Sequence, residues 1–425
     1  MLTRFFSLFL FILFAFSLHA QNPTEKDAES KQDSIKRKEF LKQLGNGFFP
    51  TKYFNSDLRY LIKYNQYEGV RTGLGAVTND AFSKKYRLNS YVVYGFRDGR
   101  FKYSIGGGFR VAKKTNTWIN VSYTDDLQET GSTKFLTDKR FFQFFEPRLL
   151  NIDLFHKHVT KAIAIEHQLL PELLTETELA VSNIDPTYSY GYVLDNNAVI
   201  HSFHLSTAKV ALQWSPFSQF KSTKNGLTET KAGYPKFTLQ YTKSFNDVFK
   251  SEFSFSKLDF RTIYKIGNEK DKFSEITLVS GIANGNTPLT HMYHAYPNNI
   301  TKETVMQRFS VAGLNSFETM YFNEFFSDKF ATFQFKHFVK PFNISQRYKP
   351  QLVLISRYAI GDMKNPEKHQ NITFGSLKNG YTESGFEINK LLFGFGLSFT
   401  YRYGAYHLSQ FTDNFAFKFT FNVSL

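Results

Sequence analysis

The sequence predicts an all-β fold, a closed antiparallel transmembrane β-barrel of about 16 strands with long extracellular loops. Three observations support this prediction: an apolar N-terminal segment typical of export, strands with one apolar and one polar face, and an aromatic-rich composition without cysteine. Aromatic residues make up 18% of the 425 residues, yet the mean hydropathy is −0.35. A barrel reconciles these values, because its apolar side chains face lipid and its polar side chains line the interior.

The C-terminal hairpin, residues 391–425, shows the alternation most clearly. Phe, Leu and Tyr at the odd positions of 393–403 alternate with Gly, Ser, Thr and Arg, and the pattern returns over 415–425. Successive residues of a strand face opposite sides of a sheet, so each strand has one apolar face. A soluble sandwich has the same period, but an exported, aromatic-rich chain favours the closing strand of a barrel. We expect Phe415–Leu425 to be recognised by the outer-membrane insertion machinery.

Residues 1–20 have the features of a secretory signal peptide. Arg4 precedes an apolar run from Phe5 to Leu18, and Ala20 is a small residue at the expected cleavage site. An uncleaved anchor is the alternative, although the run is short for a membrane span of about 20 residues. Export without a second apolar run indicates the periplasm, the cell surface or the outer membrane, and the barrel pattern favours the outer membrane of a Gram-negative cell.

Residues 21–56 are expected to form a periplasmic leader or plug segment before the barrel, which we place at 57–425. The stretch 21–48 is polar, and a weak apolar stripe predicts one helix over 32–44 that Gly45 could end. The alternatives are a disordered leader and a short plug or docking helix. A docking helix would imply a periplasmic protein partner.

From residue 57 onward, strand-like segments alternate with turn residues. Sixteen segments are expected: 57–65, 68–78, 84–95, 100–112, 115–125, 158–168, 171–182, 199–213, 234–243, 249–263, 272–283, 325–338, 350–361, 383–390, 391–403 and 412–425. With 57–65 running outward, the long insertions 126–157, 183–198, 284–324 and 362–382 all become extracellular, as in barrels of this type. Only 214–233 is then a long periplasmic turn. Fourteen and eighteen strands are the alternative counts.

The formal net charge of +15 raises the question of an anionic partner. Lys and Arg are scattered at alternate strand positions instead of clustered, so outer-membrane lipid and lipopolysaccharide are the expected partners and nucleic acid is not. Alternation predicts an inward basic set with a few acids available to pair with it. These lumen-lining candidates are Arg59, Lys63, Arg71, Lys102, Arg110, Arg402, Lys418, Glu68, Glu252 and Asp362. They would set the selectivity of an aqueous path or form a structural network.

The sequence offers no specific catalytic signal, and we expect no enzyme, no cofactor and no metal. Without cysteine there is no thiolate ligand or nucleophile. Histidine pairs such as His291 and His294 lack the spacing of a metal site. Ser202 and His204 share a strand face, which is the only support for a lipid-modifying barrel enzyme.

Four stretches resemble a Bacteroidetes outer-membrane β-barrel family of unknown function. They are YNQYEGVRTGLGAVTN (64–79), YVVYGFRDGRFKYSIGGGF (91–109), FFSDKFATFQFKHF (325–338) and the ending 380–425. Many members of that family carry a carboxypeptidase-regulatory-like domain before the barrel, and the barrel is distantly similar to surface-antigen barrels of outer-membrane assembly. This chain has only about 28 residues between Gln21 and Phe49, too few for that domain. LKNGYTESGF (377–386) has Lys378 where the resemblance implies an arginine-centred lumen motif.

Three functions follow from these observations. A channel or transport barrel with a basic lumen is favoured, and it would fail if the leader or a loop filled the lumen. The alternative is an assembly, secretion or scaffold barrel that docks protein partners. A lipid-modifying barrel enzyme has the least support.

Overall fold

The computed structural model describes residues 28–138, 147–223, 226–269, 271–300, 310–345, 348–392 and 394–421. The expected signal peptide, residues 1–20, and the last four residues of the C-terminal strand lie outside the described residues. The leader contains one helix, α2 (Ala28–Gly45), which includes the predicted span 32–44. No helix among the described residues is long and apolar enough to cross a lipid bilayer.

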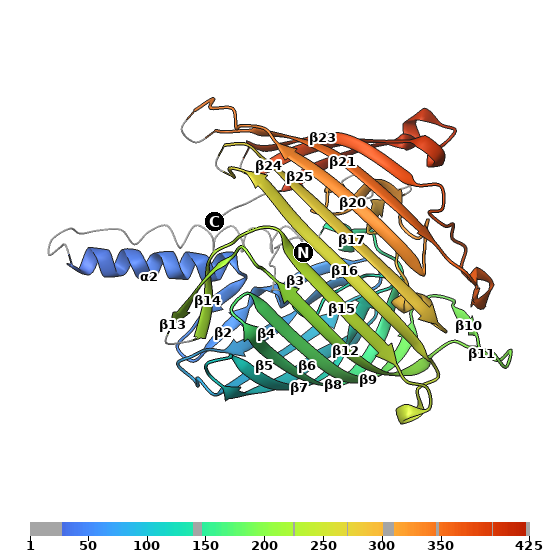
Figure 1. Ribbon diagram of the computed structural model, residues 1–425, viewed down its shortest axis with the longest axis horizontal. Coiled ribbons are helices and arrows are strands. Elements are labelled where there is room, and N and C mark those ends of the chain that lie inside the picture. Colours follow the sequence, from blue (N-terminus) through green and yellow to red (C-terminus); the bar gives the residue numbers. More distant parts are fainter. Residues whose placement is uncertain are drawn as a thin grey trace.

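One antiparallel sheet of 18 strands makes up most of the molecule and winds around a common interior (Figure 1). Its strands are β1 (Phe48–Pro50), β2 (Phe54–Asp57), β3 (Ile62–Asn65), β4 (Gly69–Thr78), β5 (Tyr86–Gly95), β6 (Arg100–Ala112), β7 (Thr117–Glu129), β8 (Phe155–Leu170), β9 (Leu173–Pro186), β12 (Phe203–Trp214), β15 (Lys236–Ser244), β16 (Phe255–Gly267), β17 (Phe273–Gly285), β20 (Lys329–Phe338), β21 (Gln351–Asp362), β23 (Tyr381–Leu392), β24 (Phe395–Tyr403) and β25 (Phe415–Phe421). From β4 to β25 each strand pairs with the next of these.

In the described parts of the connections there are seven further strands. β10 (Gly191–Val193), β11 (Val199–Ile200) and β22 (His369–Gln370) form a small sheet, β13 (Gln219–Thr223) pairs with β14 (Gly226–Lys231), and β18 (Pro297–Asn299) pairs in parallel with β19 (Phe317–Tyr321). Short 3-10 helices occupy Leu58–Tyr60, Pro147–Leu150, Val248–Lys250, Leu289–His291, Pro366–Lys368, Gly404–Tyr406 and Phe411–Asn414. The connection after β12, the one long turn expected on the periplasmic side, therefore contains a folded hairpin.

Each of the sixteen predicted segments overlaps at least one strand of the large sheet, and the all-β prediction is confirmed. The predicted strand 57–65 is broken, however, because the Asp57 carboxylate accepts a hydrogen bond from Arg59 N at 3.0 Å and starts a 3-10 turn. Among the described residues no pairing joins β25 to β2 or β3. The described residues thus form 25 strands and a sheet that is not closed, and a closed barrel of sixteen strands stays a prediction.

The two faces of the sheet differ as the alternation predicts. The outer face carries exposed apolar side chains such as Leu74 and Ile105, which are 68% and 63% exposed. The opposite positions carry polar and charged side chains, among them buried Lys102, Arg357 and Lys418. Polar groups therefore face the interior and apolar groups face outward, the reverse of a soluble protein.

The long connections 130–154, 187–202, 286–328 and 363–380 leave the sheet at one end, because consecutive strands are antiparallel. We call this the long-loop end, and the end that carries α2 and β13–β14 the short-turn end (Figure 1). The buried aromatic cluster belongs mainly to the long-loop end. It includes Tyr190, Phe203, Phe253, Tyr293, Phe317, Phe326 and Tyr381.

Candidate functional site: the loop-covered interior

The connection between β17 and β20 folds into the interior; we call its described parts, 286–300 and 310–328, the interior loop. It contacts side chains on widely separated strands: Tyr293 donates to Asp259 of β16 at 2.6 Å, and Lys418 of β25 lies 2.9 Å from Glu318. Only a segment on the concave side of the sheet reaches all these strands. The loop expected to be extracellular therefore fills part of the interior.

A buried ion network fixes the interior loop to the wall formed by β20–β25. Arg357 of β21 lies 2.7 Å from Glu383 of β23, and both side chains are fully buried. Glu383 also accepts hydrogen bonds from the backbone of the interior loop, from Glu318 N at 2.9 Å and Thr319 N at 3.0 Å. A wall carboxylate thus holds both a wall cation and the loop backbone.

Glu318 organises the loop itself. Its carboxylate accepts hydrogen bonds from Asn298 Nδ2 at 2.8 Å, Gly313 N at 3.0 Å and Ser316 Oγ at 2.7 Å, and it pairs with Lys418. The ammonium of Lys418 also donates to the carbonyl oxygen of Asn298. Because buried charges are costly unless paired and hydrogen-bonded, this set of contacts keeps the loop closely tied to β25.

Arg148, in the connection between β7 and β8, meets the interior loop beside Glu129, the last residue of β7. Arg148 Nη2 lies 2.5 Å from the Glu129 carboxylate, and Arg148 Nε donates to Pro297 O at 3.1 Å. His294 Nε2 lies 2.8 Å from the same carboxylate. Burial lowers the pKa of His294, while the neighbouring Glu129 opposes that shift.

A lid made of β10, β11 and β22 joins two connections that leave distant parts of the sheet. The Tyr190 hydroxyl lies 2.9 Å from His369 Nδ1 and accepts a hydrogen bond from Leu289 N at 3.0 Å. This contact ties the lid to the interior loop. Burial, reinforced by the positive charge of Lys368, lowers the pKa of His369 to about 4, so the imidazole is neutral at neutral pH.

The opposite wall carries a second ion network near the start of the sheet. Arg71 of β4 binds Asp126 of β7 through two hydrogen bonds of 2.7 and 2.8 Å. Glu68 is fully buried and lies 3.3 Å from Arg71 and 2.7 Å from Lys102. Tyr91 donates to Asp126 at 2.5 Å. This network links β4, β5, β6 and β7 without help from the interior loop.

Further along this wall the inward charges are paired but less buried. Arg87 lies 2.7 Å from Glu166, with the side chains 35% and 25% exposed, and Lys209 lies 3.0 Å from Glu178, with exposures of 30% and 20%. Beyond the network of Glu68, Arg71 and Lys102, the charges of the β4–β12 wall are therefore more accessible than those of the covered β20–β25 wall.

Five of the ten predicted lumen residues lie in these networks. Glu68, Arg71 and Lys102 belong to one network, whereas Arg402 and Lys418 lie on the wall covered by the interior loop. Arg402 is buried and pairs with Glu324 at 2.7 Å. Each predicted cation of this set pairs with a carboxylate, so these positions do not present an unbalanced positive charge.

The other predicted residues lie apart. Arg110 donates to Asn116 Oδ1 at 2.7 Å at the short-turn end, Arg59 pairs with Asp57 at 2.9 Å in the broken first strand, and Lys63 is half-buried in β3.

Two of the predicted acids lie at the long-loop rim instead of the interior. Glu252 accepts a hydrogen bond from His204 N at 2.6 Å in the connection after β15. Asp362 ends β21 in the register of exposed Tyr358 and Ile360, so it faces outward, toward Lys329 and Lys378.

Sequence reasoning missed the residues that hold the interior loop, especially Glu318, Arg357 and Glu383. Arg357 and Glu383 do occupy the polar phase of their strands, and that signal could have found them. Glu318 lies in a stretch without a strand pattern, and no local signal marks it. Within the described ranges no group of three or more His, Asp or Glu residues is placed to hold a metal ion.

Short segments of the same chain lie at both edges of the large sheet. On β25, Ala312 N donates to Phe419 O at 2.7 Å and Phe419 N donates to Ser310 O at 3.1 Å, around a parallel bridge between Val311 and Phe419. At the other end β1 pairs with β2. Exposed strand edges otherwise pair readily with other extended chains.

Solved structures were compared with this fold. BamA from Haemophilus ducreyi lacking POTRA domains 1–3 aligns with a TM-score of 0.51 at 9% identity, over 84% of this chain and 68% of that chain. CdiB from Escherichia coli aligns with a TM-score of 0.45 at 9% identity, over 87% and 62%. No curated protein matches the sequence. The comparison with BamA shows a common barrel-type fold.

A family model, described as the C-terminal domain of a family of unknown function (DUF5686), matches residues 45–340. The match begins at the end of α2 and continues through β20, so it includes the β4–β9 wall and the interior loop. It confirms the resemblance to a barrel family of unknown function. This chain therefore belongs to the DUF5686 family, through the C-terminal domain of that family.

Proposed function

We propose that this protein is an outer-membrane β-barrel whose interior is blocked by its own interior loop. In this proposal it docks or assembles protein partners and is not a permanently open pore. In this proposal the long-loop end faces the cell exterior, and α2 and the β13–β14 hairpin face the periplasm. The main support for this proposal is a buried network that holds the interior loop against the wall. It consists of Glu318, Lys418, Arg357 and Glu383.

Two features support a role with protein partners. The edge of β25 is paired by Ser310–Ala312, a short cover that an extended polypeptide could replace by the same backbone hydrogen bonds. Helix α2 projects from the short-turn end beside β13 and β14 (Figure 1), and its Phe40 and Leu41 are each 39% exposed.

Single-channel recording of the purified full-length protein in planar bilayers tests the proposal. We expect no stable conductance from the wild type. Glu318→Gln removes the counter-charge of Lys418 and weakens four contacts of the interior loop, so it should produce intermittent steps. Lys209→Met, on the accessible wall, is the matched control and should stay silent. Steady ohmic conductance of the wild type would overturn the closed-barrel proposal.

Site-specific cross-linking in cells tests the docking role. The chain has no cysteine, so Phe40→Cys introduces a unique thiol on α2, and Leu74→Cys places a control thiol on the lipid-facing surface. We expect one defined protein adduct at position 40 and none at position 74. The absence of an adduct at position 40, or the same adduct at both positions, would argue against docking through α2.

One observation supports the transport barrel that the sequence favours. The accessible charges of the β4–β12 wall could border an aqueous path that opens when the interior loop moves. The intermittent steps of Glu318→Gln would support such a gated path. Because Arg71, Lys102, Arg402 and Lys418 are each paired with a carboxylate, anion preference is not expected of it.

A further inference from the structure

A notch interrupts the wall between β6 and β7 at the long-loop end. The β6–β7 ladder ends at the pair Tyr103–Asp125, whereas β7 continues to pair with β8 up to Glu129 and Phe155. A cavity of 280 Å³ lies where the two strands diverge. Because the strands part here, residues of both sheet faces line this cavity, which we call the β6–β7 notch.

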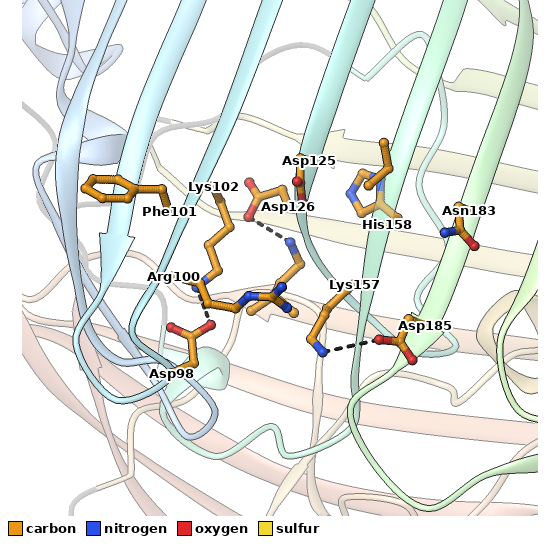
Figure 2. Close-up of a pocket in the computed structure, with 12 residues that line it drawn as sticks. Asp98, Arg100, Phe101, Lys102, Asp125, Asp126, Lys157, His158, Asn183 and Asp185 are labelled. Carbon is orange, nitrogen blue, oxygen red and sulfur yellow. Dashed lines mark hydrogen bonds and ion pairs between the residues drawn. The ribbon is translucent and has the colours of Figure 1, made fainter.

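Most charges in the β6–β7 notch neutralise one another. Lys102 lies 2.5 Å from Asp98, Lys157 lies 3.2 Å from Asp185, and Asp126 is held by Arg71 behind the cavity. Figure 2 shows the first two of these pairs as dashed lines on either side of the cavity.

Two charges remain, Arg100 and Asp125. Neither forms an ion pair or a side-chain hydrogen bond with any residue that the structure describes, although both line the cavity. The guanidinium of Arg100 lies in the middle of the drawn cluster, between Lys102 and Lys157 (Figure 2). Counting the described residues alone, the notch therefore offers one free cation and one free anion in an otherwise neutral site.

An apolar surface adjoins the charged cavity on the outer face. Phe101 is 66% exposed and lines the notch, and Tyr103 and Ile105 follow it along β6 on the same face. Val121 of β7 lies beside this row and is also exposed. A polar cavity above an apolar column matches an amphiphile, whose head occupies the cavity and whose chains lie along the wall.

We propose that the β6–β7 notch binds the headgroup of a zwitterionic lipid, in which a phosphate is joined by a short linker to a primary ammonium. Arg100 holds the phosphate, since the guanidinium fork matches phosphate oxygens, and Asp125 accepts the ammonium. A purely anionic headgroup would place its charge near the unpaired carboxylate of Asp125. This proposal rests on the outer-membrane placement proposed above.

Lipid retention measured by native mass spectrometry of the full-length protein tests the proposal. The probes are phosphatidylethanolamine, phosphatidylglycerol, which has the phosphate without the ammonium, and soluble O-phosphoethanolamine. We expect the wild type to retain phosphatidylethanolamine about tenfold better than phosphatidylglycerol, a difference of about 1.4 kcal/mol. Arg100→Ala should lose both lipids, whereas Asp125→Asn should bring the two lipids to similar retention.

Arg97→Ala is the matched control, because Arg97 is an exposed arginine of the same β5–β6 turn that instead donates to Gln66 O at 2.8 Å. It should retain the wild-type preference. Competition by soluble O-phosphoethanolamine at the concentration of the lipid would support the site and identify a free aminoalkyl phosphate as its ligand; competition only at much higher concentration would identify the membrane lipid.

Equal retention of the two lipids by the wild type, or unchanged retention by Arg100→Ala, would overturn the proposal. These readouts are separate from conductance. A wild type that conducts and prefers phosphatidylethanolamine would contradict the proposed function but support lipid binding at the notch. A silent wild type without that preference would contradict lipid binding at the notch alone.

Discussion

The two walls of the interior follow the same strand alternation but place their charges in different surroundings. On the β20–β25 wall, Arg357 and Glu383 are fully buried beneath the interior loop. On the β4–β12 wall, Lys209 and Glu178 form an equally direct pair but keep 30% and 20% of their side-chain surface exposed. The comparison shows that strand phase decides which side chains face inward, while for Arg357 and Glu383 a distant loop shields those inward side chains from solvent.

This difference has energetic consequences. Removing one member of a buried ion pair leaves an uncompensated charge and costs about 3–5 kcal/mol. Removing one member of a solvated pair costs about 0–1 kcal/mol, because water screens the partner that remains. Variants of the two pairs therefore test whether the walls differ as the structure indicates.

Glu383→Gln should have the largest effect. The substitution leaves Arg357 buried without its carboxylate and weakens the hydrogen bonds from Glu318 N and Thr319 N. We expect the free energy of unfolding to fall by about 3–5 kcal/mol. Urea unfolding of the protein in detergent or lipid vesicles, followed by the gel shift of folded barrels, measures this loss.

The double variant Arg357→Met/Glu383→Leu provides the control for Glu383→Gln. Removing both charges removes the uncompensated guanidinium, so much of the lost stability should return. Urea midpoints that are equally low in the single and double variants would show that hydrogen bonds to the interior loop dominate instead of the ion pair.

The lid should give an intermediate, pH-dependent effect. Because burial lowers the pKa of His369 to about 4, the folded lid binds a proton less readily than the unfolded chain, whose histidine titrates near 6.5. The lid is therefore most stable above about pH 6.5 and loses stability as the pH falls toward 4, by about 3 kcal/mol at most. Hydrogen exchange of β10 and β22 across this range measures the loss.

His369→Phe is the matched variant, because it keeps an apolar ring against Phe374 but does not titrate. Its lid exchange should be nearly independent of pH. Full pH dependence in this variant would show that His369 is not the group that controls the lid.

Strand phase made much of the sheet predictable. Alternation alone assigned polar residues such as Arg71, Lys102 and Lys418 to the inner face. Lys102 and Lys418 are buried and the Arg71 side chain is 12% exposed, which agrees with that face. The broken first strand was missed, because the competing hydrogen bond between Asp57 and Arg59 N is local and weakly marked in a sequence that otherwise alternates.

The loop-covered site could not be predicted in the same way. Glu318 meets Lys418 across 100 residues of sequence, and Asn298 meets Glu318 from another part of the same connection. Such contacts depend on how a connection without strand periodicity folds into a space that the sheet creates. The sequence also left open whether the interior was filled, because the answer depends on long-range packing and not on residue type.

Lys209→Met should have the smallest effect and sharpens the comparison between the walls. Lys209 of β12 and Glu178 of β9 face each other across one strand pair, with solvent access to both. We expect a loss of at most about 1 kcal/mol, and a coupling energy of the same size in a double-mutant cycle with Glu178→Gln. The loss should shrink at high salt, since added ions screen exposed charges. A coupling of 3 kcal/mol or more, insensitive to salt, would mean that this wall is as shielded from solvent as β20–β25, and the distinction between a covered and an accessible side of the interior would fail.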